Sequence, residues 1–450
     1  MQIPAWVLTA SLLLLSDLVW AEHSAQNHLD PLSFGLHLPF LEEVHTTFLT
    51  VQEGCQSAGS TEQQDAEKAR LLDRMRRNNG QWDTNHPRHR LLQALHGFRR
   101  YEETHVEDVS RWEGLYRHVS KRQRPILEKT IGYSGKFGKA KQRMVHNAAV
   151  SEAIVQAGLG YYEMEATELE DYIRDAEKGG PAGHGADKVS VSQTLKHFIK
   201  DWASEGGVER GPGFSCVFDN LRSLNLSDGS GHLADGPRRQ VLIPGAGLGR
   251  LGHEVAQLGY QVTINEWSMY MNVAYRFLEQ QHCVRNSHML YPFVDNWSHH
   301  ATDEDMQRPV SFPDVAANSS SVVLVEGDFT TAFHGHAGEF DVVITYFFID
   351  TARNLMTYLE TIHRLLRPGG YWLNFGPLLY GSAPFVQLSL EEILLVSQSL
   401  GFSFVEIPSS CGEPTLPGWP VRWMESIYGF NARALVKHAY KSQAWAAQKH

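Results

Sequence analysis

The pattern of apolar positions changes near residue 239 and divides the chain into two parts. Residues 62–178 carry apolar side chains at helical spacing, and residues 190–203 repeat that amphipathic pattern. Beyond them, short apolar runs alternate with helical stretches, which is typical of βαβ units on a parallel sheet. The predicted strands are 240–243, 261–264, 321–325, 340–346 and 371–375, and the predicted helices are 249–258, 268–281 and 351–366. We therefore expect an α/β fold behind an N-terminal helical region.

These patterns predict four parts of the chain. They are a candidate signal or anchor segment (1–21), a polar irregular segment (22–61), a helical region with a glycine-rich linker at 179–183 (62–189), and the α/β domain (190–440). Within the α/β domain, residues 282–318 are predicted to form a long polar insertion. The tail is predicted to hold a helix at 389–400, then strands at 402–407 and 432–438 that form an antiparallel edge.

The charge balance narrows the class of partner. The formal net charge is −11, whereas binding to a phosphate backbone needs clustered Lys and Arg. The basic runs at 68–77 and 88–100 are interleaved with acids and leucines, so we interpret them as solvated helix faces. The sequence therefore predicts no nucleic-acid partner.

Cysteine spacing indicates neither a metal centre nor a disulfide framework. The four cysteines are Cys55, Cys216, Cys283 and Cys411, and no two of them form a CxxC pair. Structural zinc sites and small disulfide-rich domains depend on close, repeated cysteine spacing, so we expect neither in this chain.

The first residues do not decide the cellular compartment of the protein. An apolar run at 6–15 is followed by Ala21, a small residue that suits a signal cleavage site, but no Lys or Arg precedes the run. The run is too short to span a bilayer, so no membrane partner is expected. The sequons at Asn225, Asn296 and Asn318 are usable only if the chain enters the secretory pathway. A signal or anchor segment and a cytosolic start stay equal alternatives.

A glycine turn follows the first predicted strand of the sheet. Gly245, Gly247 and Gly249 are spaced as GxGxG, and Arg250 follows them. Glycines let the chain turn tightly and bring its backbone close to a ligand. Dinucleotide sites favour GxGxxG, with a pyrophosphate at the helix N-terminus. The shorter spacing favours a ligand that places an amino-acid moiety against the turn.

Acidic residues follow the next two strands. Glu266 comes about 20 residues after the turn, where a carboxylate can accept both ribose hydroxyls of an adenosine; the alternative is a surface glutamate at a strand end. Asp328 and Phe329 are placed to hold an adenine by its amino group and its face. Residues 367–370, Arg-Pro-Gly-Gly, end a helix before the next strand, although such turns also serve as ordinary helix stops.

With these elements the sequence resembles the class I S-adenosylmethionine-dependent methyltransferases, which have a Rossmann-like sheet. More closely, it resembles the carnosine N-methyltransferase family, from about Thr194 to Lys437. The segments that carry the resemblance are Leu195-Lys-His-Phe-Ile-Lys-Asp-Trp202 with Glu209-Arg210, Ile243-Pro-Gly-Ala-Gly-Leu-Gly-Arg-Leu251, Gly259-Tyr260 with Asn265-Glu-Trp-Ser268, Phe312-Pro-Asp314, Phe347-Phe-Ile-Asp-Thr-Ala352 and Gly376-Pro-Leu-Leu-Tyr380. Members methylate the imidazole of carnosine, β-alanyl-histidine, to give anserine. The resemblance implies S-adenosylmethionine as cofactor and a small histidine-containing peptide as substrate.

The cofactor contacts that the resemblance implies fall on the glycine turn, on strand ends and on the helix before the turn. They are His197, Lys200, Gly245, Gly247, Glu266, Asp328, Phe329 and Tyr346. The family carries Gln and Arg where this chain has His197 and Lys200. Lys200 keeps the charge but loses the bidentate fork of Arg, and His197 is expected to hydrogen-bond as a titrating group.

The acceptor contacts implied by the resemblance are Asp350, which would hold the imidazole as the catalytic residue, and Tyr380 and Tyr428. The family carries a substrate-contacting His after its Leu-Leu-Tyr, whereas this chain has Gly381 there. A second family Tyr has no clear counterpart in 413–419. The acceptor half of the site therefore matches only in part. The resemblance also implies a cytoplasmic protein, and a homodimer stays open.

Residue chemistry alone gives Asp350 two interpretations. It follows the fourth strand, at the carboxyl edge where open α/β sheets bind ligands, and it also precedes a predicted helix that it would cap. With the resemblance we expect substrate contact, because a carboxylate can select the attacking imidazole nitrogen and stabilise the imidazolium that forms. Two other classes of protein stay open, a non-catalytic cofactor-binding scaffold and a nicotinamide-dependent oxidoreductase.

Overall fold

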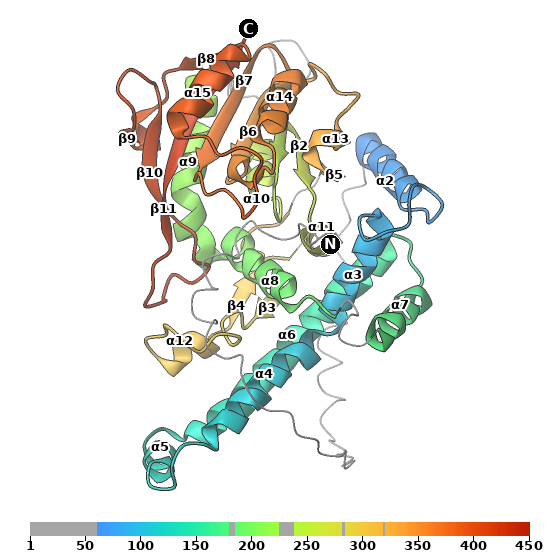
Figure 1. Cartoon of the computed structure of the whole chain (residues 1–450), viewed down its shortest axis with the longest axis vertical. Helices are drawn as coiled ribbons and strands as arrows, with labels where there is room; N and C mark the ends of the chain where they lie inside the picture. The colour runs from blue at the N-terminus through green and yellow to red at the C-terminus, as the bar shows by residue number, and fades with distance from the viewer. Residues whose placement is uncertain (1–60, 180–184, 225–237, 281–283, 318–319) are drawn as a thin grey trace. The chain divides into compact units, whose positions relative to one another are not determined.

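The computed structural model describes residues 61–179, 185–224, 238–280, 284–317 and 320–450 (Figure 1). The predicted segment 1–21, nearly all of 22–61, most of the glycine linker, Cys55, Cys283 and the sequons at Asn225 and Asn318 lie outside the described residues. From Gly59 onward the chain forms one unit. None of the described helices is both long enough and apolar enough to cross a membrane.

A mixed sheet forms the centre of this unit. The strand order is β5-β2-β1-β6-β7-β11-β10-β9, and β8 also pairs with β11. The first five strands in this order are parallel, whereas β11 is antiparallel to its three neighbours. The strands are β1 (Gln240–Pro244), β2 (Gln261–Glu266), β5 (Val322–Glu326), β6 (Phe340–Tyr346), β7 (Leu366–Gly376), β8 (Phe402–Val405), β9 (Glu413–Pro414), β10 (Arg422–Ile427) and β11 (Ala439–Lys449). The strand order reverses between β1 and β6, and ligands bind at such a switch point. The expected Rossmann-like methyltransferase sheet is confirmed.

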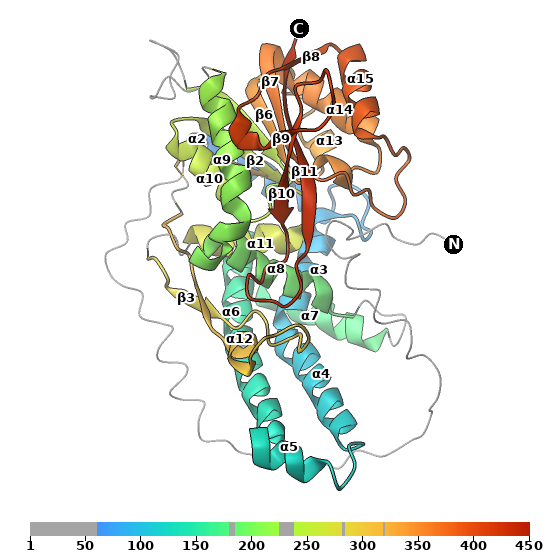
Figure 2. The same ribbon diagram turned by 90° about the vertical axis from the view of Figure 1, so that its left-hand side faces the viewer.

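Helices cover both faces of the sheet, which Figure 2 shows edge-on. One face carries α9 (Gly207–Ser223) and α10 (Arg250–Gln257), and the other carries α14 (Leu355–Leu365) and α15 (Leu390–Ser399). Successive side chains of a strand point to opposite faces. In β1, Val241 and Ile243 accordingly enter one hydrophobic core and Leu242 enters the other. The near-continuous apolar strands of the sequence reflect burial on both faces.

The N-terminal helices are α2 (Glu62–Arg74), α3 (Pro87–Arg99), α4 (Tyr101–Tyr116), α5 (Arg124–Ile131), α6 (Tyr133–Tyr161), α7 (Ala166–Lys178) and α8 (Lys188–Trp202). Of these, α3, α6 and α8 pack against α11 (Met269–Gln280) of the sheet domain, and α2 packs against β5. A Cβ added at Gly158 of α6 would lie 2.9 Å from both Leu95 of α3 and Val273 of α11. The absence of a side chain there allows the three helices to approach closely.

Some elements differ from the sequence prediction. The pattern predicts no helix at α9, because that segment begins at Gly207 and contains Pro212. The polar insertion 282–318 holds structure among its described residues: β3 (His288–Leu290), α12 (Asp303–Gln307) and β4 (Val310–Phe312). β7 begins at Leu366, so the Pro-Gly-Gly segment lies within a strand instead of ahead of it.

The end of the sheet also differs. The strand predicted at 432–438 is wrong: this stretch is a turn that contributes only a single bridge, from Ala434 to His300. The strand is β11, which continues to Lys449 and therefore passes the expected domain end at 440. Its pairing with a distant strand, β7, sets its position, and local alternation does not reveal such pairing.

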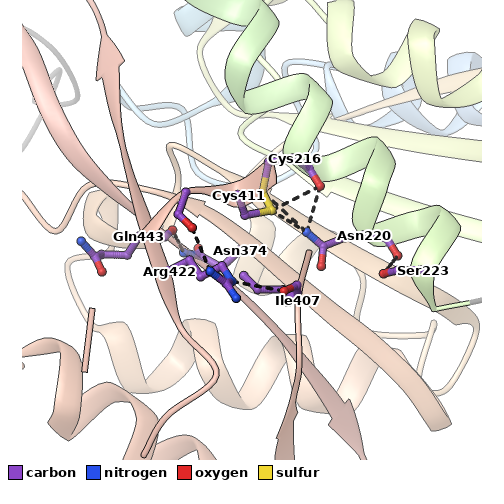
Figure 3. Close-up of a disulfide and its surroundings, with 9 residues drawn as sticks. Cys216, Asn220, Ser223, Asn374, Ile407, Cys411, Arg422 and Gln443 are labelled. Atoms are coloured by element: carbon purple, nitrogen blue, oxygen red, sulfur yellow. Dashed lines mark hydrogen bonds between the residues drawn. A yellow bond between two sulfur atoms is a disulfide. The ribbon is translucent and has the colours of Figure 1, made fainter. Parts of the chain in front are cut away.

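A disulfide joins Cys216 of α9 to Cys411 in the 3-10 helix η5 (Ser409–Cys411), as Figure 3 shows. The sequence predicts no disulfide framework, and it does not predict this single bond. The two residues are separated by 195 positions, so spacing carries no signal, and only the fold brings their Cα atoms to 4.8 Å. Asn220 donates to the Cys216 carbonyl at 2.8 Å and to Cys411 Sγ at 3.1 Å.

Candidate active site

The glycine turn lies between β1 and α10. Gly245 has φ +65°, and an added Cβ would lie 2.3 Å from a Phe348 ring carbon, so packing forbids a side chain. Gly247 has φ +57°, and the nearest atom to an added Cβ is an Asp201 carboxylate oxygen at 3.7 Å. A side chain at 247 would therefore project into open space beside α8. That cradle fits a ligand that lies against the backbone of the turn.

Glu266 holds the glycine turn from the end of β2. Its Oε2 accepts the Gly247 N–H at 2.9 Å, and its Oε1 accepts the N–H groups of Trp267 and Ser268, each at 2.7 Å. Burial raises the pKa of this carboxyl, and the three backbone donors act against that shift. Glu266 thus shapes the turn itself. Its contact with a ribose stays a prediction.

Asp328 and Phe329 follow β5, as expected, but both are engaged in packing. Asp328 is exposed, and its carboxylate accepts the N–H of Thr330 at 2.8 Å, which caps the short helix α13 (Phe329–Ala332). Phe329 is buried edge-on to the rings of Phe348 and Tyr358. Their roles at an adenine stay predictions, and the burial of Phe329 disfavours a role as a stacking platform.

A cleft of ≈ 70 Å³ opens beside the turn. Its walls include His197, Lys200, Gly247, Tyr346, Phe347 and Tyr428. The structure therefore brings the predicted cofactor residues of α8, the turn and β6 together with one predicted acceptor residue. Glu266, Asp328 and Phe329 lie outside this wall, on the side of β2 and β5.

Opposite charges lie side by side where α8 faces the cleft. Lys200 Nζ lies 2.9 Å from Asp201 Oδ1 and 5.3 Å from the ring centre of Tyr428. Burial opposes the charge of both groups, but each charge favours the other. The pKa of Lys200 is therefore raised and that of Asp201 lowered. Such a pair is complementary to the zwitterionic end of an amino acid.

His197 is a neutral hydrogen-bonding group. Burial, with a contribution from the charge of Lys200, lowers the pKa of His197 to about 4. The expectation of a titrating group is therefore wrong near neutral pH. Its Nδ1 lies 2.8 Å from the Gln193 carbonyl oxygen, and its Nε2 lies 3.2 Å from the Tyr428 hydroxyl. A carbonyl can only accept, so Nδ1 carries the proton and Nε2 accepts from Tyr428. His197 thereby orients Tyr428.

Glu209 fixes the chain that carries Tyr428. Its Oε1 accepts the N–H groups of Gly429 and Phe430, at 2.7 and 2.6 Å. The sequence gives this residue no role, although it belongs to a segment of the resemblance. The contact crosses from α9 to the end of β10, and no local pattern predicts it.

Asp314 joins two buried arginines behind the cleft. It lies 2.6 Å from Arg210 of α9 and 2.5 Å from Arg250 at the start of α10. Arg250 is therefore paired with Asp314, and it also lines the cleft beside the turn. Buried charges need such partners. Arg210 and Asp314, which belong to two of the segments that carry the resemblance, therefore have a structural role.

Asp350 lies just beyond β6, in the 3-10 turn η4 (Ile349–Thr351). The helix-cap interpretation is wrong, because α14 begins at Leu355 with Asn354 as its N-cap residue. Asp350 is only 6% exposed, and its Oδ2 accepts the N–H of Leu379 at 3.0 Å. Burial raises the pKa of Asp350 to about 6, although the Leu379 bond opposes the shift. A buried carboxyl at the carboxyl edge of the sheet, with its pKa raised to about 6, is a candidate for acid-base work.

Two tyrosines lie near Asp350. The Tyr380 hydroxyl donates to the Leu388 carbonyl at 2.7 Å and accepts its N–H at 3.2 Å, so it holds the loop that follows Gly381. Burial and the Asp350 charge raise the pKa of Tyr440, which lies on β11. The sequence does not single out Tyr440, because it predicts no strand there.

Phe347 lines the cleft and also lies near Tyr440. Its φ is +52°, a conformation that side chains rarely adopt. Its ring stacks on Tyr428 at 5.3 Å and lies 6.3 Å from the ring of Tyr440. A bond from its N–H to the Phe375 carbonyl, at 2.8 Å, helps to hold this backbone. Strained residues cluster at functional sites, but nothing in the sequence indicates positive φ at a phenylalanine.

Arg90 of α3 lies near Glu266 and Asp328, two of the predicted cofactor residues. Its guanidinium lies 3.7 Å from the ring centre of Trp267 and donates to the Trp267 carbonyl. Burial lowers the pKa of Arg90 to about 10, and the charges of Glu266 and Asp328 act against that shift. The solvated-face interpretation of the run 88–100 is therefore wrong at this residue. A run of charges does not reveal which member points inward.

Comparisons with known proteins agree with this geometry. The sequence model of the family described as carnosine N-methyltransferase matches residues 182–450. The chain belongs to the carnosine N-methyltransferase family. Membership of the carnosine N-methyltransferase family makes the protein a methyltransferase that uses S-adenosylmethionine.

Two relatives show the extent of the match to the carnosine N-methyltransferase family. The carnosine N-methyltransferase of Mus musculus is 31% identical over 371 residues, covering 80% of this chain and 86% of its own. That of Schizosaccharomyces pombe is 35% identical over 281 residues, covering 57% of this chain and 70% of its own. A solved S-adenosylmethionine-dependent methyltransferase of Thermotoga maritima covers 58% of this chain and 100% of its own, with 11% identity and a TM-score of 0.30. The superposition is loose, whereas the strand order β5-β2-β1-β6-β7 is itself that of a Rossmann-like sheet.

Proposed function

We propose that the protein transfers a methyl group from S-adenosylmethionine to an imidazole nitrogen of carnosine or of a related histidine-containing dipeptide. Family membership supports the reaction class. The acceptor assignment rests on Asp350, a buried carboxylate at the carboxyl edge of β6 that caps no helix. With carnosine the product is anserine.

The residues of the cleft fit the cofactor. The open space beside Gly247 would hold the methionine part of S-adenosylmethionine. Its α-ammonium would lie toward Asp201 and its α-carboxylate toward Lys200. Glu266 would hold the ribose, and His197 would keep Tyr428 in place. When bound, S-adenosylmethionine supplies a sulfonium methyl group, which passes to the acceptor nitrogen while sulfur keeps the bonding pair.

Asp350 acts on the acceptor. An imidazole with a pKa of about 6.5 is mostly neutral near pH 7, so it is already a nucleophile. The ionised Asp350 accepts the N–H of the non-reacting nitrogen, which leaves the other nitrogen's lone pair free to attack. As the ring becomes imidazolium, the carboxylate stabilises its charge and then takes the proton. Alignment of the reactants contributes on the order of 7–11 kcal/mol.

S-adenosylmethionine and S-adenosylhomocysteine should each raise the melting temperature by several degrees, and NAD should not. A ligand at about 100 times its Kd stabilises the native state by ~2.7 kcal/mol. Gly247→Val should abolish the shift, because its side chain would occupy the cradle. Gly338→Val is the matched control, since Gly338 also has positive φ, at +72°, but no atom within 4 Å of an added Cβ. A shift with NAD alone would instead favour an oxidoreductase.

Gly381→His should raise kcat/KM for carnosine by about ten- to a hundredfold, the value of one regained polar contact. The wild-type chain should turn over carnosine weakly, or should prefer a bulkier histidine-containing acceptor that fills the space beside Tyr380. Initial rates on a panel of histidine dipeptides measure both effects. Ser382→His, at an exposed neighbouring position, is the control. Equal rates for Gly381→His and the wild type would contradict this explanation, and cofactor binding without any turnover would favour a scaffold.

The partner is a small molecule, in keeping with the family. Two statements about partners stay proposals: that the protein binds no nucleic acid, and that it forms a homodimer. The methyl transfer requires neither. The cytoplasmic location implied by the resemblance has an alternative in the secretory pathway.

A further inference from the structure

The bond between Cys216 and Cys411 has no part in the proposed transfer. Both cysteines are buried, 1% and 0% exposed, and their Cα separation of 4.8 Å lies in the range that a disulfide requires. Figure 3 shows the pair where α9 meets the segment that leads to β10. Within the described ranges, no cluster of His, Cys, Asp and Glu could hold a metal ion. The pair is a structural link between α9 and η5.

Such a link is typical of an oxidising compartment. Cytosolic glutathione and thioredoxin keep thiols reduced, so structural disulfides are concentrated in the secretory pathway and outside cells. The bond closes a loop of 195 positions. It ties α9, which carries Glu209, to η5, which precedes β10, the strand that ends just before Tyr428. The correct placement of a cleft residue therefore depends on two segments that the oxidised pair holds together.

An independent feature points to the same compartment. Asn296-Trp297-Ser298 is the sequon whose asparagine the structure describes, and the side chain of Asn296 is exposed. Its carboxamide oxygen accepts the Ser298 N–H at 3.0 Å. Trp297 is anchored inward, with its ring 5.4 Å from Phe137 and 5.0 Å from Trp112. This anchor keeps the neighbouring Asn296 at the surface.

We propose that the chain matures in the secretory pathway with an N-linked glycan on Asn296 and the Cys216–Cys411 bond formed. In the disulfide step, two thiols lose two protons and two electrons to the disulfide of a thiol oxidase, which becomes a dithiol. In the glycan step, the Asn296 amide nitrogen bonds to the first sugar carbon of a lipid-linked oligosaccharide. Its proton passes to a base of the transferase, and the lipid diphosphate leaves. The apolar run at 6–15 would direct export.

The test uses the full chain with its own N-terminus, expressed in a eukaryotic cell. Peptide mapping without reduction should find the Cys216 and Cys411 peptides linked, and reduction should separate them. Peptide N-glycosidase should remove a glycan and convert Asn296 to aspartate. Ser298→Ala should lose this glycan and Ser298→Thr should keep it, because transfer needs a hydroxyl at that position. Neither variant alters a residue of the cleft, so methyl-transfer rates should be unchanged.

Three outcomes would overturn the proposal. Asn296 could be unmodified in the wild-type chain, or Cys216 and Cys411 could both be alkylated as free thiols before reduction. The Asn296 glycan could also survive Ser298→Ala, which would exclude N-linkage through this sequon. None of these outcomes bears on the methyl acceptor, so the two proposals fail independently.

Discussion

Asp350→Asn is expected to lower kcat by ~10²–10³-fold, because it removes the charge that stabilises the developing imidazolium. The variant should keep the fold, since the Asn oxygen can still accept the Leu379 N–H that Asp350 accepts at 3.0 Å. The Kd for S-adenosylhomocysteine should stay near that of the wild type, because Asp350 is proposed to contact the acceptor and not the cofactor. Initial rates and calorimetric titration measure the two quantities. Asp219→Asn, which alters a half-buried carboxylate paired with Arg222, is the control.

The raised pKa of Asp350 gives this variant a second signature. Burial raises the pKa to about 6 from 3.8, so the folded state holds its proton more tightly than the unfolded state does. Stability is therefore lost as pH rises through this window, and above about pH 6 the ionised carboxylate costs the fold up to ~3 kcal/mol. Asp350→Asn should be more stable than the wild type near pH 8, and the difference should vanish toward pH 4. A merely structural aspartate would give the opposite result, a less stable variant near pH 8.

The same titration should appear in turnover. Asp350 must be ionised to accept the imidazole N–H, so the kcat of the wild type should fall as pH drops below about 6. Free substrate also protonates near pH 6.5, but that affects kcat/KM and not kcat at saturation. In Asp350→Asn the acid limb of kcat should disappear. Full activity in this variant would contradict the assignment of Asp350 to the acceptor.

Glu266→Ala is expected to weaken S-adenosylhomocysteine binding by at least ~100-fold. The change leaves three backbone donors of the glycine turn without their acceptor, each at a cost of about 1–3 kcal/mol, and it also removes the proposed ribose contact. Part of the loss should appear as a lower melting temperature of the free protein. Calorimetric titration and thermal unfolding of the same preparation measure both.

Glu266→Gln separates the two roles of Glu266. The amide oxygen of Gln can still accept the N–H groups that one oxygen of Glu266 accepts. Its NH2 group would face the N–H on the other side, where neither group can accept. The Kd for S-adenosylhomocysteine should therefore lie between the values for the wild type and Glu266→Ala. Glu339→Ala, at an exposed glutamate paired with His336, should leave binding unchanged. Wild-type affinity in Glu266→Ala would show that the turn and the ribose do not depend on this carboxylate.

The features predicted from sequence are those set by local chemistry. β1, the glycine turn, α10 and β2 follow from apolar runs and from glycines with positive φ, and Glu266 follows because it ends a strand. The position of Asp350 at the carboxyl edge of β6 is likewise local. The surroundings of Asp350 cannot be predicted from the sequence. They show that Asp350 does not cap α14, and burial among them raises its pKa.

The features that escape prediction depend on contacts between distant segments. α9 forms despite Gly207 and Pro212 because its apolar face packs on the sheet. The position of β11 is set by its pairing with β7. Arg90 points inward because its guanidinium packs on the ring of Trp267. The disulfide belongs to the same class of long-range contact.

Transfer of an isotope-labelled methyl group tests the central claim most directly. Purified protein is incubated with methyl-labelled S-adenosylmethionine and carnosine, and two-dimensional NMR identifies the atom that carries the label. The proposed function predicts anserine, with the label on an imidazole nitrogen, an equal amount of S-adenosylhomocysteine, and loss of product in Asp350→Asn. A label on any other atom, or cofactor binding with no labelled imidazole across the panel of histidine peptides, would contradict it.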